Sequence, residues 1–156
     1  MLRLILLRHA KSDWGDPALP DHDRPLNDRG RRAAPLIGAW LRARPPLPDR
    51  VLVSDARRTR ETWAGLGLPG EPTFRRDLYH AEAGTIRAAL PDAGCALLIG
   101  HNDGIAEAAR RLCHEPPDHP QFHRFPTAAC LILRFDGAAE WGAGVVEGFI
   151  VPRDLA

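Results

Sequence analysis

Arginine and histidine side chains follow three short apolar runs of the sequence, close to the point where each run ends. Arg8 and His9 come directly after the first run, Arg57 and Arg58 lie shortly after the second, and His101 follows the third. A planar guanidinium donates paired hydrogen bonds to phosphate oxygens, and a neutral imidazole is a competent nucleophile near pH 7. Gathered in one pocket, these side chains would bind a phosphoryl group and could transfer it.

This chemistry requires the two histidines to be in different states. His9 must present one unprotonated nitrogen to the phosphorus atom, while its other nitrogen is held by a hydrogen bond, for example to a backbone carbonyl. A protonated His101 would donate to the phosphate and stabilise the transition state. A single histidine after a strand is usually structural, and a single arginine there usually lies on the surface. The prediction therefore depends on the joint placement of these residues.

The elements that must position these side chains are short strands alternating with helices. Apolar runs predict strands over residues 2–7, 50–53, 96–99 and 130–135, with an edge strand at 144–151. Apolar stripes at helical spacing predict helices over 27–42, 56–66, part of 78–90 (capped near Gly84), and 103–113. The proline-rich stretches 44–49 and 115–126 are predicted loops.

This alternation predicts an α/β fold with a mostly parallel, helix-covered central sheet, in a single domain over residues 1–156. Ligands of open α/β sheets bind beyond the carboxyl ends of the strands. If the first three strands are parallel neighbours, Arg8, His9 and His101 converge at that edge with Arg57 or Arg58. Five aspartates in the segment after the first strand are predicted to lie on a solvated rim: Asp13, Asp16, Asp21, Asp23 and Asp28.

The composition is that of an ordinary globular protein and excludes several functions. The chain has 156 residues, of which 44% are hydrophobic and 26% are charged, and its formal net charge is +1. Such a small net charge argues against a general nucleic-acid binder. The three cysteines are widely spaced, and we find no signal peptide or membrane-spanning run. We therefore expect a cytoplasmic protein that does not contact a membrane, and we expect it to be a monomer.

No cofactor signature is recognised. His114, His119 and His123 share a predicted loop, but their spacing matches no common metal site. The glycine-rich run at 141–148 has Glu147 where a dinucleotide-binding loop has its third glycine. We expect neither a metal nor an organic cofactor.

Several motifs resemble those of the histidine phosphatase superfamily, which includes the phosphoglycerate mutases. Residues 6–10, LLRHA, resemble its RHG signature, and the longer run RHAKSDW is similar to the short branch containing bacterial phosphohistidine phosphatases. Residues 25–30, PLNDRG, resemble the start of a family helix. Residues 54–62 match the family's S-x-x-x-R-x-x-x-T pattern, which selects Arg58 over Arg57. Residues 99–102 match its second histidine motif, and residues 125–129 resemble the segment before a late strand.

The resemblance implies a three-layer α/β/α sandwich of the phosphoglycerate mutase-like type and a ping-pong reaction without a metal. A phosphoryl group transfers to His9, the leaving group departs, and water hydrolyses the phosphohistidine. Arg8, Arg58 and His101 hold the phosphoryl oxygens throughout. The resemblance also implies further substrate-binding residues: Ser12, Asn102, Thr127 and Ala128.

The proton donor to the leaving group stays open. Family members that act on phosphate monoesters usually carry a glutamate in the segment after the arginine motif. Here that segment offers Asp77, His80 and Glu82. The other alternative is that no dedicated acid exists, as in the short branch.

The short chain leaves little room for the inserted cap that recognises sugar phosphates in larger family members. An open site favours phosphohistidine on a protein surface, so we predict a phosphohistidine phosphatase. The alternatives are a phosphatase for small phosphoesters, a mutase, and a module that recognises phosphate without turnover. His9 argues against the last, because a pure binder needs donors and no nucleophile.

Overall fold

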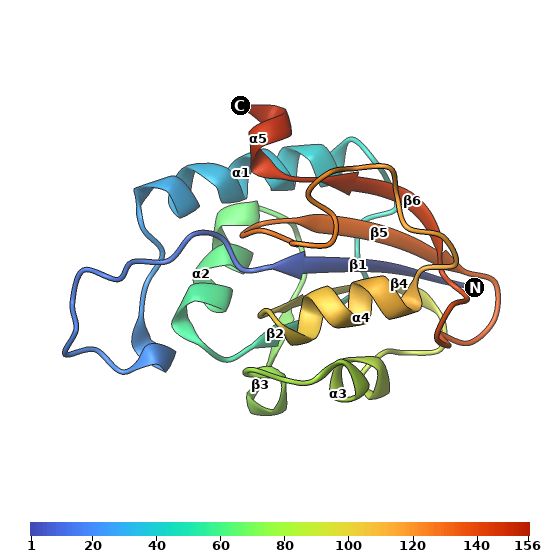
Figure 1. The fold of residues 1–156 in the computed structure, drawn as a ribbon, viewed down its shortest axis with the longest axis horizontal. Coiled ribbons are helices and arrows are strands. Elements are labelled where there is room, and N and C mark those ends of the chain that lie inside the picture. Colours follow the sequence, from blue (N-terminus) through green and yellow to red (C-terminus); the bar gives the residue numbers. More distant parts are fainter.

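The computed structural model describes all 156 residues, and its centre is a six-stranded sheet (Figure 1). The strands are β1 (Leu2–Arg8), β2 (Arg50–Ser54), β3 (Pro72–Arg75), β4 (Gly94–Gly100), β5 (Cys130–Phe135) and β6 (Val145–Ile150). Their order across the sheet is β3-β2-β4-β1-β5-β6. The first four strands are parallel to one another, while β5 and β6 run antiparallel to their neighbours. The prediction of a mostly parallel sheet is confirmed.

Helices cover both faces of the sheet and give three layers. One face is covered by α1 (Asp28–Arg42), α2 (Arg57–Leu66) and the short α5 (Pro152–Leu155) (Figure 1). The other face is covered by α3 (Ala83–Ala88) and α4 (Gly104–Leu112). Side chains of β1 alternate between the two layers: Leu4 and Leu6 pack under α3 and α4, and Ile5 and Leu7 pack under α1 and α2. A central strand buried on both faces explains the continuous apolar run at residues 2–7.

The predicted elements are confirmed to within a few residues at most ends, and the differences have physical reasons. β3 was not predicted, because it is a four-residue edge strand whose apolar Phe74 is exposed. The four-residue α5 was also missed. The third helix, α3, has only six residues. No helix reaches the length and apolarity that crossing a membrane requires.

Two short 3₁₀ turns lie in the connections between strands and helices. The 3₁₀ turn Asp21–Asp23 lies between β1 and α1, and a second one, Arg76–Leu78, follows β3. Helix α1 begins as predicted, because the side chain of Asn27 accepts a hydrogen bond from the backbone N–H of Gly30 at 2.9 Å.

Gly30 lets the first turn of α1 pack against the backbone that follows His9. A Cβ atom at residue 30 would lie 2.2 Å from the carbonyl oxygen of Lys11, far inside contact distance. We expect Gly30→Ala to lower the free energy of unfolding by about 2 kcal/mol, since the loop must move to admit the methyl group. Urea unfolding followed by circular dichroism measures this.

Gly84 of α3 is the matched control, because nothing lies within 4 Å of its Cβ position. Alanine also has the better helix propensity, so Gly84→Ala should leave stability unchanged or raise it by up to about 1 kcal/mol. Equal stability of the two variants would contradict the close packing at Gly30.

Candidate active site

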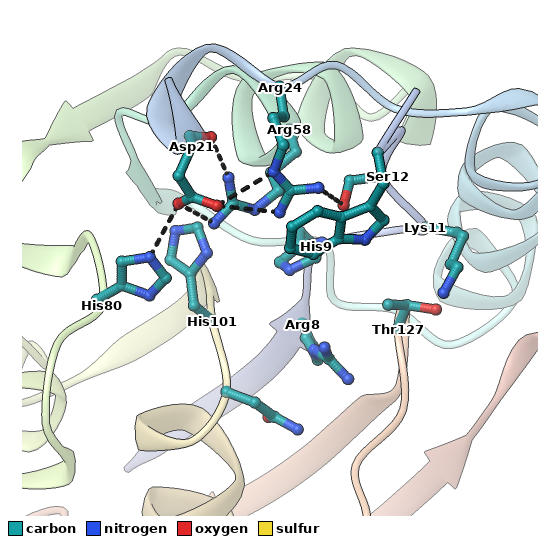
Figure 2. Close-up of a pocket in the computed structure, with 12 residues that line it drawn as sticks. Arg8, His9, Lys11, Ser12, Asp21, Arg24, Arg58, His80, His101 and Thr127 are labelled. Atoms are coloured by element: carbon teal, nitrogen blue, oxygen red, sulfur yellow. Dashed lines mark hydrogen bonds and ion pairs between the residues drawn. The ribbon is translucent and has the colours of Figure 1, made fainter. Parts of the chain in front are cut away.

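The carboxyl ends of three adjacent parallel strands bring the predicted residues together. In the β2-β4-β1 part of the sheet, Arg8 pairs with Gly100, so His9 and His101 leave the sheet side by side. Arg58 comes from the first turn of α2, which follows β2. Figure 2 shows Arg8, His9, Arg58 and His101 around one pocket of about 210 Å³. The structure therefore brings these four side chains together at this edge of the sheet, as predicted.

Backbone contacts hold His9 in place. Its N–H donates to the carbonyl oxygen of Gly100 at 3.1 Å. The N–H of Ala128 donates to the carbonyl oxygens of both Arg8 (3.1 Å) and His9 (2.9 Å). Ala128 reaches them by adopting a φ of 60°, a left-handed conformation that costs a non-glycine residue energy. The predicted substrate-binding residue Ala128 therefore fixes the end of β1 and does not line the pocket.

The ring of His9 has a defined tautomer. Its Nδ1 lies 2.7 Å from the carbonyl oxygen of Ala10. A carbonyl only accepts, so Nδ1 carries the proton and Nε2 keeps its lone pair. This is the arrangement that the sequence analysis required of a nucleophilic histidine. Ala10 is fixed in turn, since its N–H donates to the hydroxyl oxygen of Thr62, the last residue of the S-x-x-x-R-x-x-x-T pattern.

Burial keeps both histidines neutral in the protein alone. It lowers the pKa of His9 to about 3, although the bond to Ala10 opposes the shift, and the nearby guanidinium groups lower the pKa further. Burial, His9 and Arg58 lower the pKa of His101 to about 2. The expectation of a protonated His101 therefore does not describe the protein by itself. A doubly negative phosphoryl group beside His101 would favour its protonated form.

These pKa values give an expected result in an NMR titration. At pH 5 the ring nitrogens of His9 and His101 should still give the signals of neutral imidazole, while added free histidine, with a pKa near 6.5, is protonated. The unfolded chain would bind both protons below about pH 6.5, so the folding stability should fall as the pH is lowered from about 7 to about 5. A protonation midpoint above about pH 6 for either ring would contradict the assignment.

His101 is held by Ser54, the first residue of the same pattern. Its Nε2 lies 2.8 Å from the hydroxyl oxygen of Ser54, at the end of β2. Its Nδ1 is buried and has no hydrogen-bond partner. The centroids of the His9 and His101 rings are 5.3 Å apart, so the two rings share one wall of the pocket.

Unpartnered polar atoms are concentrated in this pocket. Five buried side-chain nitrogen or oxygen atoms of the chain lack a hydrogen-bond partner, and four of them belong to pocket residues: Arg8 Nε, Arg58 Nε, His101 Nδ1 and Asn102 Oδ1. Buried polar groups are nearly always paired, so such a group of exceptions needs an explanation. Two guanidinium nitrogens and an imidazole nitrogen in one small hollow suit an anion with several acceptor oxygens.

The charges in the pocket also favour the binding of an anion. Four cationic side chains (Arg8, Lys11, Arg24 and Arg58) face a single carboxylate, that of Asp21. Burial and the neighbouring Arg58 lower the pKa of Arg8. Two guanidinium groups held close together away from water favour a multiply charged anion between them.

Asp21 has a role that the sequence analysis missed. The interpretation of all five aspartates as a solvated rim is wrong for this residue. One of its carboxylate oxygens accepts hydrogen bonds from Arg58 (3.0 Å), His80 (3.0 Å) and the Tyr79 hydroxyl, and the other accepts one from Arg24 (3.1 Å). Burial alone would raise the pKa of Asp21, but the bonds from Tyr79, His80 and Arg58 lower it well below its usual range.

The carboxylate of Asp21 orients Arg58. The other terminal nitrogen of that arginine donates to the Asp21 carbonyl oxygen at 2.7 Å, so both ends of the guanidinium are fixed by one residue. The two residues are 37 positions apart, and no local pattern in the sequence connects them. Arg24 in turn donates to the hydroxyl oxygen of Ser12 at 2.9 Å and holds that predicted substrate-binding residue at the pocket.

The other candidate residues divide into those in the pocket and those outside it. Asn102 and Thr127 line the pocket. Of the three candidate proton donors, His80 lines the pocket. Asp77 forms an exposed ion pair with Arg75, and Glu82 precedes α3 without reaching the site. His119, one of the three histidines of the loop at 115–126 and its preceding residue, is hydrogen bonded to Asp154.

Comparison with known proteins agrees with this geometry. Residues 4–85 match the model of the histidine phosphatase superfamily (branch 1). An uncharacterized Mycobacterium tuberculosis protein, Rv1276c, is 36% identical over 159 residues, which cover 94% of this chain and 100% of that protein.

Solved structures share the fold over nearly the whole chain. A SixA protein from Nakamurella multipartitia, described as a candidate phosphohistidine phosphatase, superposes with a TM-score of 0.83 at 31% identity, over 96% of this chain and 95% of that one. The protein histidine phosphatase SixA in complex with tungstate has a TM-score of 0.81 at 23% identity, over 99% of each chain. At 23% identity, the similarity to this second structure shows a shared fold only.

Proposed function

Because the chain belongs to the histidine phosphatase superfamily and is a phosphatase, we propose that it hydrolyses phosphohistidine on proteins through a covalent intermediate on His9. The observation that carries this proposal is the tautomer of His9. Its Nδ1 is committed to the Ala10 carbonyl at 2.7 Å, which leaves Nε2 unprotonated in a pocket of unpartnered donors. Similar SixA proteins from Nakamurella multipartitia and Agrobacterium tumefaciens, both described as candidate phosphohistidine phosphatases, support the choice of substrate.

In the first step, Nε2 of His9 attacks the phosphorus atom and a new P–N bond forms. The P–N bond to the substrate imidazole breaks, and the departing nitrogen takes up a proton. Arg8, Arg58 and His101, which takes up a proton from the solvent as the dianion binds, hold the phosphoryl oxygens in the transition state. Because the Asp21 carboxylate already fixes Arg58, little reorganisation is needed in the transition state.

In the second step, water attacks the phosphorus atom and the bond to His9 breaks. Inorganic phosphate leaves, and the proton lost by the water balances the one delivered to the departing group. His80 is the candidate for both transfers, because it lines the pocket and its Nε2 lies 3.0 Å from Asp21. Neither step requires a metal, since the guanidinium groups supply the positive charge.

A phosphatase for small phosphoesters is the second candidate. His80 favours it, because an alkoxide leaving group gains more from a nearby proton donor than an imidazole does. The pocket volume of about 210 Å³ would admit a phosphate with a small organic group. Both candidates use the same His9 chemistry and differ in the leaving group.

Measuring phosphate release with EDTA present, from a phosphohistidine protein and from p-nitrophenyl phosphate, tests the proposal. We expect many turnovers on the phosphohistidine protein and a higher kcat/KM for it than for the ester. A higher value for the ester would select the second candidate. Tight tungstate binding without release from either substrate would indicate a phosphate-recognition module, and loss of turnover in EDTA would contradict the metal-free mechanism.

We also propose that the protein works as a cytoplasmic monomer. Its three cysteines are buried and form no disulfide, which is usual in a reducing compartment. Light scattering after gel filtration should give a mass near 17.2 kDa.

A further inference from the structure

A second hollow adjoins the candidate active site. It has a volume of about 280 Å³ and shares Lys11 and Thr127 with the pocket of His9. In Figure 2 these two residues lie on the side of the pocket opposite His80, away from the Asp21 carboxylate. A third hollow, of about 490 Å³, continues from the second along α1 and shares Arg29 and Arg153 with it. We call the second and third hollows together the basic groove.

The basic groove is lined by cations and has no acidic side chain. Its cations are Lys11, Arg29, Arg32, Arg124 and Arg153. None of these five side chains forms a hydrogen bond or an ion pair within the protein. Seven other arginines, by contrast, form ion pairs with carboxylates: Arg3, Arg24, Arg31, Arg57, Arg58, Arg75 and Arg134.

 The acidic side chains beside the groove are engaged elsewhere, since Asp28 pairs with Arg31 and Asp154 with His119. No acidic side chain therefore neutralises the positive charge of the groove.

The shape and the positive charge of the groove suit the binding of an extended peptide segment. Arg29, Arg32, Ala33 and Leu36 are spaced by three, four and seven residues, so they form one face of α1 that leads away from the pocket. Leu36, at the far end, is an exposed large apolar side chain. Arg29, Arg124 and Arg153 come from three separate segments and are all exposed, unlike the buried arginines that would clamp a single phosphate. Such a row of flexible cations matches several spaced carboxylates.

We propose that the basic groove binds an acidic segment of the phosphorylated protein while its phosphohistidine occupies the pocket of His9. The inference rests on the proposed function in taking a protein as the substrate. Carboxylates of the segment would pair with Arg29, Arg124 and Arg153, and Lys11 would lie between the segment and the phosphoryl group. The groove thereby selects among phosphohistidine proteins by the charge next to the modified residue.

Two fluorescent phosphohistidine peptides test this, one with four glutamates beside the phosphohistidine and one with four glutamines. Each is prepared with the flank on either side of the phosphohistidine, so that both directions of the segment are covered. Binding is measured by anisotropy to His9→Ala protein, so that no turnover is needed. We expect the glutamate peptide to bind about tenfold more tightly at low salt, with the preference falling as salt is added.

Charge reversal identifies the surface. The double variant Arg29→Glu/Arg153→Glu, in the same background, should lose the preference for glutamate. Arg60→Glu on α2, whose guanidinium lies over Phe74 at the β3 edge, is the matched control and should keep it. In the wild-type background the double variant should hydrolyse p-nitrophenyl phosphate at the normal rate, because neither residue lines the pocket of His9.

Equal binding of the two peptides, or an equal loss in Arg60→Glu, would overturn the proposed docking site. Failure of the proposed function gives a different result. In that case the wild-type protein would bind the glutamate peptide preferentially but would not release its phosphate.

Discussion

Replacing His9 by alanine should lower kcat on any substrate by about 10⁴-fold or more, because the variant has no atom to accept the phosphoryl group. The donors that bind phosphate stay in place, since the backbone of residue 9 is held by Gly100 and Ala128 rather than by the imidazole. We therefore expect the variant to bind tungstate with an affinity close to that of the wild-type protein. Steady-state phosphate release and tungstate titration measure the two effects.

The separation of turnover from binding is what makes this variant informative. A structural role for His9 would reduce both together, and circular dichroism would report the loss of fold. A variant that keeps turnover within tenfold of the wild-type rate would remove His9 from the mechanism. Water would then have to attack the substrate directly.

Replacing Arg58 by alanine should have the second-largest effect, a loss in kcat/KM of about 10³-fold. Its side chain is 2% exposed, its Nε is buried without a partner, and its two terminal nitrogens are fixed by Asp21. Arg58→Lys keeps the charge but loses the paired donors, so we expect it to remain at least about 10²-fold impaired. Steady-state kinetics on both phosphohistidine protein and p-nitrophenyl phosphate measure the losses.

Arg57 is the matched control for this variant. It is the preceding residue of the same helical turn, but its side chain is exposed and pairs with Glu61 at 2.9 Å. An exposed pair of this kind contributes less than about 1 kcal/mol, so Arg57→Ala should keep kcat/KM within about twofold. Similar losses in the two alanine variants would mean that the helix, and not the Arg58 guanidinium, is what matters.

The sequence predicts the part of the site that depends on strand ends. Arg8, His9 and His101 follow apolar runs directly, and parallel pairing of β1 with β4 carries those positions to one edge of the sheet. Arg58 needed more than periodicity, because Arg57 beside it is also an arginine at a helix start. The S-x-x-x-R-x-x-x-T pattern resolved that choice, and Ser54 and Thr62 prove to be the residues that hold His101 and the backbone after His9.

The contacts between distant loops could not be predicted in this way. Asp21 lies in a loop with four other aspartates nearby, and only the tertiary fold brings it to Arg58 and His80. The basic groove likewise joins α1, α5 and the loop before β5, which have no sequence signal in common. Edge strand β3 was missed because its side chains are partly exposed, so no apolar pattern marks it.

The central claim is that the phosphoryl group passes through Nε2 of His9, and trapping that intermediate tests it most directly. Protein mixed with excess substrate is quenched in alkali within the first turnover, and the phosphorylated peptide and ring nitrogen are identified by mass spectrometry and NMR. Because Nδ1 donates to the Ala10 carbonyl, we predict phosphate on Nε2 of His9, formed at least as fast as kcat and lost on a chase. Phosphate on Nδ1, on His101 or on another residue, or product release with no phosphorylated protein at any time in the first turnover, would contradict the account.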